Sequence, residues 1–339
     1  MENTAQLPIP FGWYCVSLSR DLQPGEVKPL RYFDREMVMF RTEAGEAKVL
    51  DAYCPHLGAH LGHGGKVTGE NIACPFHAWE FSGEGVCKTV PYAANMPPKV
   101  ANGKPCIYAY PTVEKNQSIW VWYHPEQIAP LFEVEELHEL HSDDWTDIST
   151  YEWTFRSHIQ ETAENGCDAA HFMYVHGNQD VPKGEVKHEG FQRHAHFVSK
   201  APEIFEDGTF DTTGTLFRDS FLDTSSNGPG QTWQRFSGVF ETFMMGTVTP
   251  IDEKTVHLRF IFTQPKEMNE GQEIMSQAVI QNVALQVQQD MPIWEHKVYR
   301  PQPILCDGDG PINQFRKWFS QFYADGSGSS ESKKDTKAA

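Results

Sequence analysis

Two short segments that each pair a cysteine with a histidine constrain this chain more than any other feature. Cys54-Pro-His56 and Cys74-Pro-Phe-His77 are separated by seventeen residues, and both lie in glycine-rich sequence. Thiolates suit zinc and iron–sulfur clusters, and imidazole suits either metal. In a Cys2His2 zinc finger the two cysteines come together, as do the two histidines, whereas here each segment supplies one of each. This mixed order is expected when two cysteines hold one iron of a [2Fe–2S] cluster and two histidines hold the other.

The two segments resemble the Rieske family, whose pattern is Cys-x-His-x17-Cys-x-x-His with flanking glycines. The resemblance implies that these two cysteines and two histidines bind a [2Fe–2S] cluster; a zinc site and unrelated core residues are the alternatives. Rieske proteins of respiratory complexes carry an extra disulfide in these loops, and the matching positions here hold Ala59 and Phe76. The resemblance is therefore to the low-potential branch of ferredoxins and oxygenases.

Residues 8–125 are predicted to form a small all-β domain. Apolar runs at 37–40 and 47–50 flank a polar turn, which is a hairpin signal, and 119–123 is rich in aromatic and β-branched residues. Residues 126–147 are strongly acidic and predict a solvated connection, with a docking surface for a basic partner as the alternative. We therefore place the domain boundary between residues 125 and 126.

Beyond this boundary the pattern changes to long strands and helices. The sequence predicts a helix over 159–172, a clean alternating strand over 255–263 and a long helix over 272–294 that is interrupted near Pro292. Strands followed by a long helix predict an α+β domain whose sheet curls around that helix. The segment 324–339 is rich in Gly, Ser, Lys and Asp and is predicted to be disordered.

A second metal site is predicted in this α+β region. Asn165, Asp168 and His171 recur every three residues and would share one helix face, while His176 would lie just past the helix end. Two histidines and one carboxylate on one side of an iron form the facial triad of non-haem Fe(II) oxygenases. Asp168 is one candidate carboxylate. Asp290 is the better candidate because it lies on an apolar helix stripe, where an unpaired acid is costly; a salt-bridged structural role is its alternative.

Taken together, the two sites resemble the Rieske non-haem iron oxygenases from about residue 8 to residue 323. The resemblance implies an all-β Rieske [2Fe–2S] domain followed by a helix-grip (START-like) α+β catalytic domain over 126–323. It also implies that His171, His176 and Asp290 bind a mononuclear Fe(II).

The same resemblance assigns roles to the two remaining polar residues of the motif. Asp168 matches the bridging aspartate, which joins a cluster histidine of one subunit to an iron histidine of the next and so implies a homotrimer. Asn165 is grouped with Asp168 as a catalytic residue. O2 is then the co-substrate, and electrons come from NAD(P)H through a flavin reductase, a ferredoxin or both.

Two further stretches, 74–92 and 290–299, look like the steroid branch of this family, which includes the 3-ketosteroid 9α-hydroxylases and the cholesterol 7-desaturases. The segment 315–323 is similar to the end of the desaturase group. The implied activity is a monooxygenase that hydroxylates, desaturates or demethylates a hydrophobic polycyclic substrate, a steroid or sterol. A non-steroid aromatic or an N- or O-methyl compound is the alternative substrate. Aromatic and Met residues between 205 and 262 are candidates for an apolar pocket.

Composition excludes several other classes of protein. The formal net charge of −18 argues against binding to nucleic acid or to anionic membranes, and no apolar run approaches a membrane span. The N-terminus lacks the pattern of a signal peptide, and seven unevenly spaced cysteines do not suggest a secreted disulfide scaffold, so a cytoplasmic location is expected. Two competing functions remain, a Rieske electron carrier with no second iron and a zinc-stabilised binding protein.

Overall fold

A computed structural model of the chain describes residues 7–177, 181, 183–203, 205, 209, 213–238, 241–268 and 270–325. The chain forms two compact units, one spanning residues 13–133 and the other combining residues 1–12 with residues 134–339. The segment that precedes the first unit therefore belongs to the second. Most of the predicted disordered tail, 324–339, lies outside the described residues.

The first unit is built from strands, as the sequence predicts. One sheet contains β1 (Gly12–Leu18), β11 (Ser118–Tyr123) and β10 (Thr112–Lys115); a second contains β2 (Val27–Tyr32), β3 (Arg35–Arg41), β4 (Ala47–Asp51) and β9 (Ala109–Tyr110); a third contains β5 (Lys66–Thr68), β6 (Asn71–Ala73), β7 (Glu80–Ser82) and β8 (Cys87–Thr89). A short 3-10 helix, η1 (Ser19–Asp21), follows β1. The predicted hairpin is β3–β4, paired antiparallel from Met37–Asp51 to Arg41–Ala47.

One apolar cluster of this unit contains both cysteines of the metal-binding pattern. Cys54 and Cys74 are packed with Leu61, Trp79 and Phe81, all of them buried. Burial of this kind fixes the loops that carry the cysteines, because the cluster joins strands of two different sheets.

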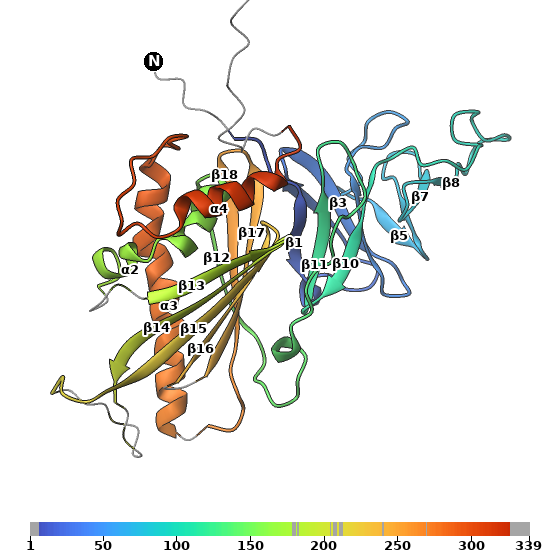
Figure 1. Cartoon of the computed structure of the whole chain (residues 1–339). Helices are drawn as coiled ribbons and strands as arrows, with labels where there is room; N and C mark the ends of the chain where they lie inside the picture. The colour runs from blue at the N-terminus through green and yellow to red at the C-terminus, as the bar shows by residue number, and fades with distance from the viewer. Residues whose placement is uncertain are drawn as a thin grey trace, which may run out of the picture. The chain divides into compact units, whose positions relative to one another are not determined.

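The second unit is an antiparallel sheet covered by a long helix, which confirms the predicted α+β class. The sheet has seven strands in the order β12-β18-β17-β16-β15-β14-β13. Their bounds are β12 (Ser149–Arg156), β13 (Lys183–Glu189), β14 (Gln192–Pro202), β15 (Phe217–Asn227), β16 (Gln231–Ser237), β17 (Thr242–Asp252) and β18 (Thr255–Thr263). Figure 1 shows α3 (Glu270–His296) lying along one face of this sheet, where Ile280 and Val283 pack on Met244 and Phe262. The strand predicted over 255–263 is β18.

The helix predicted over 159–172 is broken into three short pieces in the structure. These are α1 (Ile159–Glu164), the 3-10 helix η3 (Asn165–Cys167) and α2 (Ala170–Tyr174). The break lies at Asp168, whose backbone is extended with φ −90° and ψ 92°. His176 follows the end of α2, as expected, but Asn165, Asp168 and His171 do not share one helix face.

The interruption predicted at Pro292 is wrong, because α3 runs unbroken through that residue. A proline removes one N–H donor from the helix ladder, so a single carbonyl loses its partner. Packing holds the following turn in place, since the Trp294 ring stacks on Phe155 with centroids 5.2 Å apart. Two more helices complete the unit, α4 (Ile312–Phe319) and the 3-10 helix η4 (Ser320–Phe322).

The acidic segment before the sheet is more buried than the sequence suggests. Val134, Leu137 and Leu140 are buried, and the last of these lies in the 3-10 helix η2 (His138–Leu140). The side-chain amide of Gln231 donates to the carbonyl of Glu135 at 2.8 Å. The acids of this stretch are exposed or half-buried, as a solvated connection predicts, but the three apolar residues spaced three apart among them are buried.

His158 links α1 to the N-terminal segment of the same unit and makes folding sensitive to acid. Its Nδ1 accepts from the N–H of Gln160, as the N-cap of α1, and its Nε2 donates to the carbonyl of Pro8 at 3.1 Å. Burial lowers the pKa of His158 to about 4. A proton on Nδ1 would remove the cap acceptor, so the folded chain keeps the ring neutral.

We expect the free energy of unfolding to fall between pH 6.5 and pH 4. Above pH 6.5 the His158 ring is neutral in both the folded and the unfolded chain. Below that pH the unfolded chain binds a proton before the folded chain does, so the free energy of unfolding falls, by about 3 kcal/mol at about pH 4. Urea unfolding of the wild type and of His158→Gln across this range measures the effect. The variant should have the flatter profile, and His194→Gln, at an exposed site, should match the wild type. Parallel profiles for His158→Gln and the wild type would contradict this account.

Among the described residues, no helix combines the length and the apolar character that crossing a bilayer requires.

Candidate functional site

The two loops that carry the Cys–His pairs have the same backbone turn. The N–H of Gly58 donates to the carbonyl of Cys54, and the N–H of Ala78 donates to the carbonyl of Cys74, both at 2.9 Å. Gly58 and Ala78 both have positive φ, 77° and 52° respectively. A left-handed residue closes each turn, which is easy for glycine and strained for alanine. The two loops are therefore built alike, although the histidine lies one residue further along in the second.

The four predicted cluster residues lie close together in pairs. The Cys54 and Cys74 side chains are buried, and burial, with a further contribution from the Cys74 thiol, raises the pKa of Cys54 to about 12. The rings of His56 and His77 lie 4.9 Å apart, and the buried Nδ1 of His77 has no hydrogen-bond partner among the described residues. Two adjacent thiols and an orphaned ring nitrogen fit a cluster held by two cysteines and two histidines.

Aromatic side chains around this site were not predicted from the sequence. The Trp79 ring stacks on His56 with centroids 4.6 Å apart, and its Nε1 donates to the hydroxyl of Tyr92. Phe76 lies on His77 and is 61% exposed. The position of Trp79, two residues after a predicted ligand in a polar loop, was the available signal for its supporting role.

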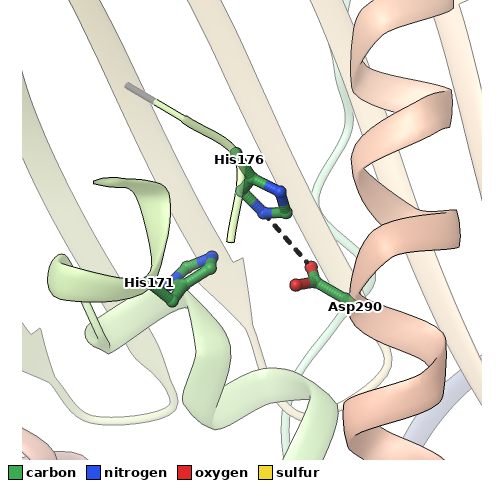
Figure 2. Close-up of side chains that lie close together, drawn as sticks. All are labelled: His171, His176 and Asp290. Atoms are coloured by element: carbon green, nitrogen blue, oxygen red, sulfur yellow. Dashed lines mark ion pairs between the residues drawn. The ribbon is translucent and has the colours of Figure 1, made fainter. Parts of the chain in front are cut away.

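The second predicted site is assembled from three separate elements. His171 lies on α2, His176 follows α2, and Asp290 lies on α3; Figure 2 shows their side chains converging. One possible ligand atom from each residue lies within 4.8 Å of the others, and the His176 Nε2 is 3.4 Å from the Asp290 Oδ2. Two imidazoles and one carboxylate on one side of a point are the donor set of a facial iron triad.

Hydrogen bonds orient both imidazoles for metal binding. The Nδ1 of His171 contacts the main-chain carbonyl of Asp168, and the Nδ1 of His176 contacts the Oε1 of Gln289 at 2.9 Å. Each carbonyl oxygen can only accept, so each Nδ1 carries the proton. Each Nε2 therefore carries the lone pair with which its ring can bind a metal, the arrangement that outer partners impose at metal sites; that of His171 lies 3.2 Å from the Asn165 Nδ2. Gln289 was missed in the sequence because its contact is 113 residues distant along the chain.

Asn165 and Asp168 lie beside the triad in different ways. The Nδ2 of Asn165 donates to the Asp290 Oδ2 at 3.0 Å and lies 3.2 Å from the His171 Nε2. Burial raises the pKa of Asp290, while His176, His171 and Asn165 lower it. The carboxylate of Asp168 accepts from the N–H groups of Ala170 and His171, so only its main-chain carbonyl contacts the histidine ring.

A cavity opens beside the triad and reaches between the sheet and α3. It contains about 1050 Å³ of space, part of it continuous with solvent, and His171, His176 and Asp290 contribute to its lining. Phe236, Met244 and Phe260, from the predicted pocket candidates, line it as well. Of the other candidates, Phe210 and Phe240 lie outside the described residues, and Phe205 and Phe217 are exposed.

Two family models match the chain. The model described as Rieske [2Fe-2S] domain matches residues 12–110, and the model described as 3-Ketosteroid 9alpha-hydroxylase C-terminal domain matches residues 121–323. The oxygenase component of a 3-ketosteroid-9-alpha-monooxygenase from Rhodococcus rhodochrous is 32% identical over 333 residues, which cover 93% of this chain and 81% of that protein. Cholesterol 7-desaturase nvd from Xenopus laevis is 32% identical over 337 residues, covering 94% and 72%.

Solved structures share the fold at low sequence identity. Apo dicamba monooxygenase superposes with a TM-score of 0.71 at 16% identity, covering 94% of this chain and 98% of that one. NdmA of Pseudomonas putida CBB5 with caffeine gives 0.71 at 17% identity, covering 91% and 89%. The fold of this chain is therefore shared by proteins of known structure.

Proposed function

The chain belongs to the Rieske oxygenases whose C-terminal domain is that of the 3-ketosteroid 9α-hydroxylases, and from this premise we propose that it oxidises a steroid or sterol. It is an O2-dependent oxidoreductase, the oxygenase component of a system with a separate electron donor. The observation that carries the proposal is the triad of His171, His176 and Asp290 at the wall of a largely apolar cavity between the sheet and α3.

We assign the metal-binding roles as follows. Cys54, His56, Cys74 and His77 hold the [2Fe–2S] cluster; in support, the two thiols form no disulfide and interact with each other, and the buried His77 Nδ1 has no hydrogen-bond partner among the described residues. His171, His176 and Asp290 hold the mononuclear iron. When bound, the cluster supplies electrons one at a time and the iron provides the site at which O2 reacts.

The overall reaction of a hydroxylation consumes a substrate C–H bond, O2, two electrons and two protons, and it yields an alcohol and water. Desaturation or oxidative demethylation would begin with loss of hydrogen from the same kind of carbon. The chain positions that carbon by enclosing the substrate between α3 and the sheet, where Val283, Val287 and Phe260 line the cavity.

Three further features belong to this proposal. We propose a homotrimer in which Asp168 of one subunit connects its triad to the cluster of the neighbour. The electron donor is a reductase, with or without a ferredoxin, that draws on NAD(P)H. The seven cysteines form no disulfide, which supports a reducing, cytoplasmic location.

A single turnover tests the substrate class. The protein is reduced chemically and mixed with O2 and one of four compounds, a 3-ketosteroid, cholesterol, a 4-methylsterol or a polycyclic aromatic, and the products are identified by mass spectrometry. An oxygenated or dehydrogenated steroid supports the proposal and distinguishes hydroxylation, desaturation and demethylation. Product from the aromatic alone, or from none of the four, would overturn the steroid assignment.

Gln289 should strengthen iron binding through His176. Replacing it with Leu removes the acceptor of the His176 Nδ1 proton, so the ring is free to turn and the iron affinity of the triad falls roughly 10–100-fold. Competition with a calibrated chelator measures the affinity. Gln288→Leu, at the exposed neighbouring position, is the control and should bind iron like the wild type. Equal affinity in both variants would show that the contact does not orient the ring.

A further inference from the structure

One wall of the cavity is polar, although the substrate proposed above is largely apolar. Five of its lining residues lie on the adjacent strands β14, β15 and β16, and we call them the polar wall: Arg193, Thr224, Ser226, Thr232 and Gln234. The strand register places them side by side. Arg193 pairs with Ser226 and Ser226 with Thr232, while Thr224 pairs with Gln234. The polar side chains therefore form a continuous patch across three strands.

Apart from the triad, Thr162, Asn165 and Gln286, the rest of the cavity lining is apolar. Val248 of β17, Leu258 and Phe260 of β18, and Val283 and Val287 of α3 line the side away from β14. A molecule that fills this cavity meets hydrocarbon over most of its surface and hydrogen-bonding groups at one end. The cavity is therefore shaped for a substrate with an apolar body and a polar terminus.

Arg193 is the unusual member of the polar wall. Its side chain is 3% exposed, yet no carboxylate among the described residues lies within ion-pair distance of it. One nitrogen, Nη2, donates to the carbonyl of Gly166 at 2.7 Å, while the buried Nε has no partner. A buried guanidinium without a counter-charge is unfavourable unless a ligand supplies one.

The contact with Gly166 also places this end of the cavity relative to the triad. Gly166 follows Asn165, which donates to Asp290, so the guanidinium is anchored to the turn that borders the metal site. A group held by Arg193 would therefore be bound on the same side of the cavity as the reacting carbon.

We propose that the substrate carries a carboxylate, which Arg193 binds with help from the hydroxyls of Ser226 and Thr232. This inference rests on the proposed function and narrows it to a polycyclic acid. The carboxylate supplies the missing counter-charge and accepts from the guanidinium of Arg193, which lines the cavity. The apolar walls bind the ring system, and the pair of contacts sets which carbon faces the iron.

Calorimetry with the metal-loaded protein tests the inference without any variant. The probes are two matched pairs, a steroid monocarboxylic acid with its methyl ester and a polycyclic aromatic acid with its methyl ester. In at least one pair the acid should bind at least about tenfold more tightly than the ester, the scale of a hydrogen bond to a charged group. Esters that bind as tightly as their acids in both pairs would overturn the inference, as would the absence of binding by either acid.

Variants then test whether Arg193 is the residue that causes the preference for acids. Arg193→Gln should bring the acid-to-ester ratio of affinities close to one, and Arg193→Lys should retain part of it. His194→Gln, on the same strand with an exposed side chain, should leave the ratio unchanged. Full acid preference in Arg193→Gln would contradict the assignment of Arg193.

The failures of the two proposals are distinguishable. Turnover of neutral steroids with no preference for acids would leave the proposed function intact and refute the inference that the substrate carries a carboxylate. Preference for the aromatic acid, with neither steroid bound, would remove the steroid assignment and leave the role of Arg193 in place.

Discussion

Replacing Asp290 with Asn should abolish oxygenation while the iron–sulfur cluster stays in place. The variant keeps the size of the side chain and an oxygen that can accept from Asn165, but it removes the only carboxylate of the triad. Neutral amides are poor ligands for iron, so iron falls from about three to about two atoms per chain, because the cluster holds two. The rate of product formation falls by roughly a thousandfold or more, the scale seen when a catalytic unit loses a member.

Iron analysis, the visible absorption of the cluster and the turnover rate separate the causes. The absorption should match that of the wild type, because Asp290 and the cluster residues lie in different compact units. Asp223→Asn, at a half-exposed position of β15 where the carboxylate pairs with His196, is the control and should retain both iron sites and activity. An Asp290→Asn variant with full iron content and normal turnover would refute the metal site.

Replacing Asp168 with Asn should leave both metal sites filled and slow turnover roughly 10–100-fold, the cost of losing a partner beside a metal ligand. The Asn oxygen can still accept from the N–H groups of Ala170 and His171, so α2 keeps its first turn. The negative charge is lost, and with it the group proposed to connect the triad to the cluster of a neighbouring subunit. Stopped-flow oxidation of the reduced cluster measures that transfer directly.

A second substitution separates charge from folding at this position. Asp168→Ala loses the acceptor as well as the charge, so it should also lower the melting temperature, whereas Asp168→Asn should not. Cluster oxidation at the wild-type rate in Asp168→Asn would show that the carboxylate has no part in electron transfer. Slow oxidation in both variants, with only the Ala variant unstable, is the expected pattern.

Local motifs allowed much of this protein to be predicted from its sequence. The segments around Cys54 and Cys74 combine residue type with fixed spacing, and the structure places their donor atoms together. Asp290 could be predicted as a ligand because a charged residue interrupts an apolar stripe on a long helix, and α3 buries that stripe and brings Asp290 to His171 and His176. Both signals are contained within a few turns of chain, which is why sequence alone carries them.

Contacts that join distant segments could not be predicted in the same way. Gln289 and Arg193 matter through their partners His176 and Gly166, and no spacing rule connects such pairs. The continuity of α3 through Pro292 also depends on tertiary packing, which outweighs the local preference of one residue. Similarly, the broken helix near Asp168 reflects an extended residue that periodicity does not reveal.

The membership of residues 7–12 in the second unit makes that unit discontinuous along the chain. The N–H of Phe11 donates to the carbonyl of Phe322, and the carbonyl of Pro8 accepts from His158. The chain therefore contacts the later part of the second unit before it enters the cluster-bearing unit at residue 13. The cluster-bearing unit is therefore an insertion rather than an N-terminal appendage. Exchanging it for the corresponding unit of another oxygenase requires two junctions, one near residue 12 and one near residue 134, because a single fusion point would remove the N-terminal segment that contacts Phe322 and His158.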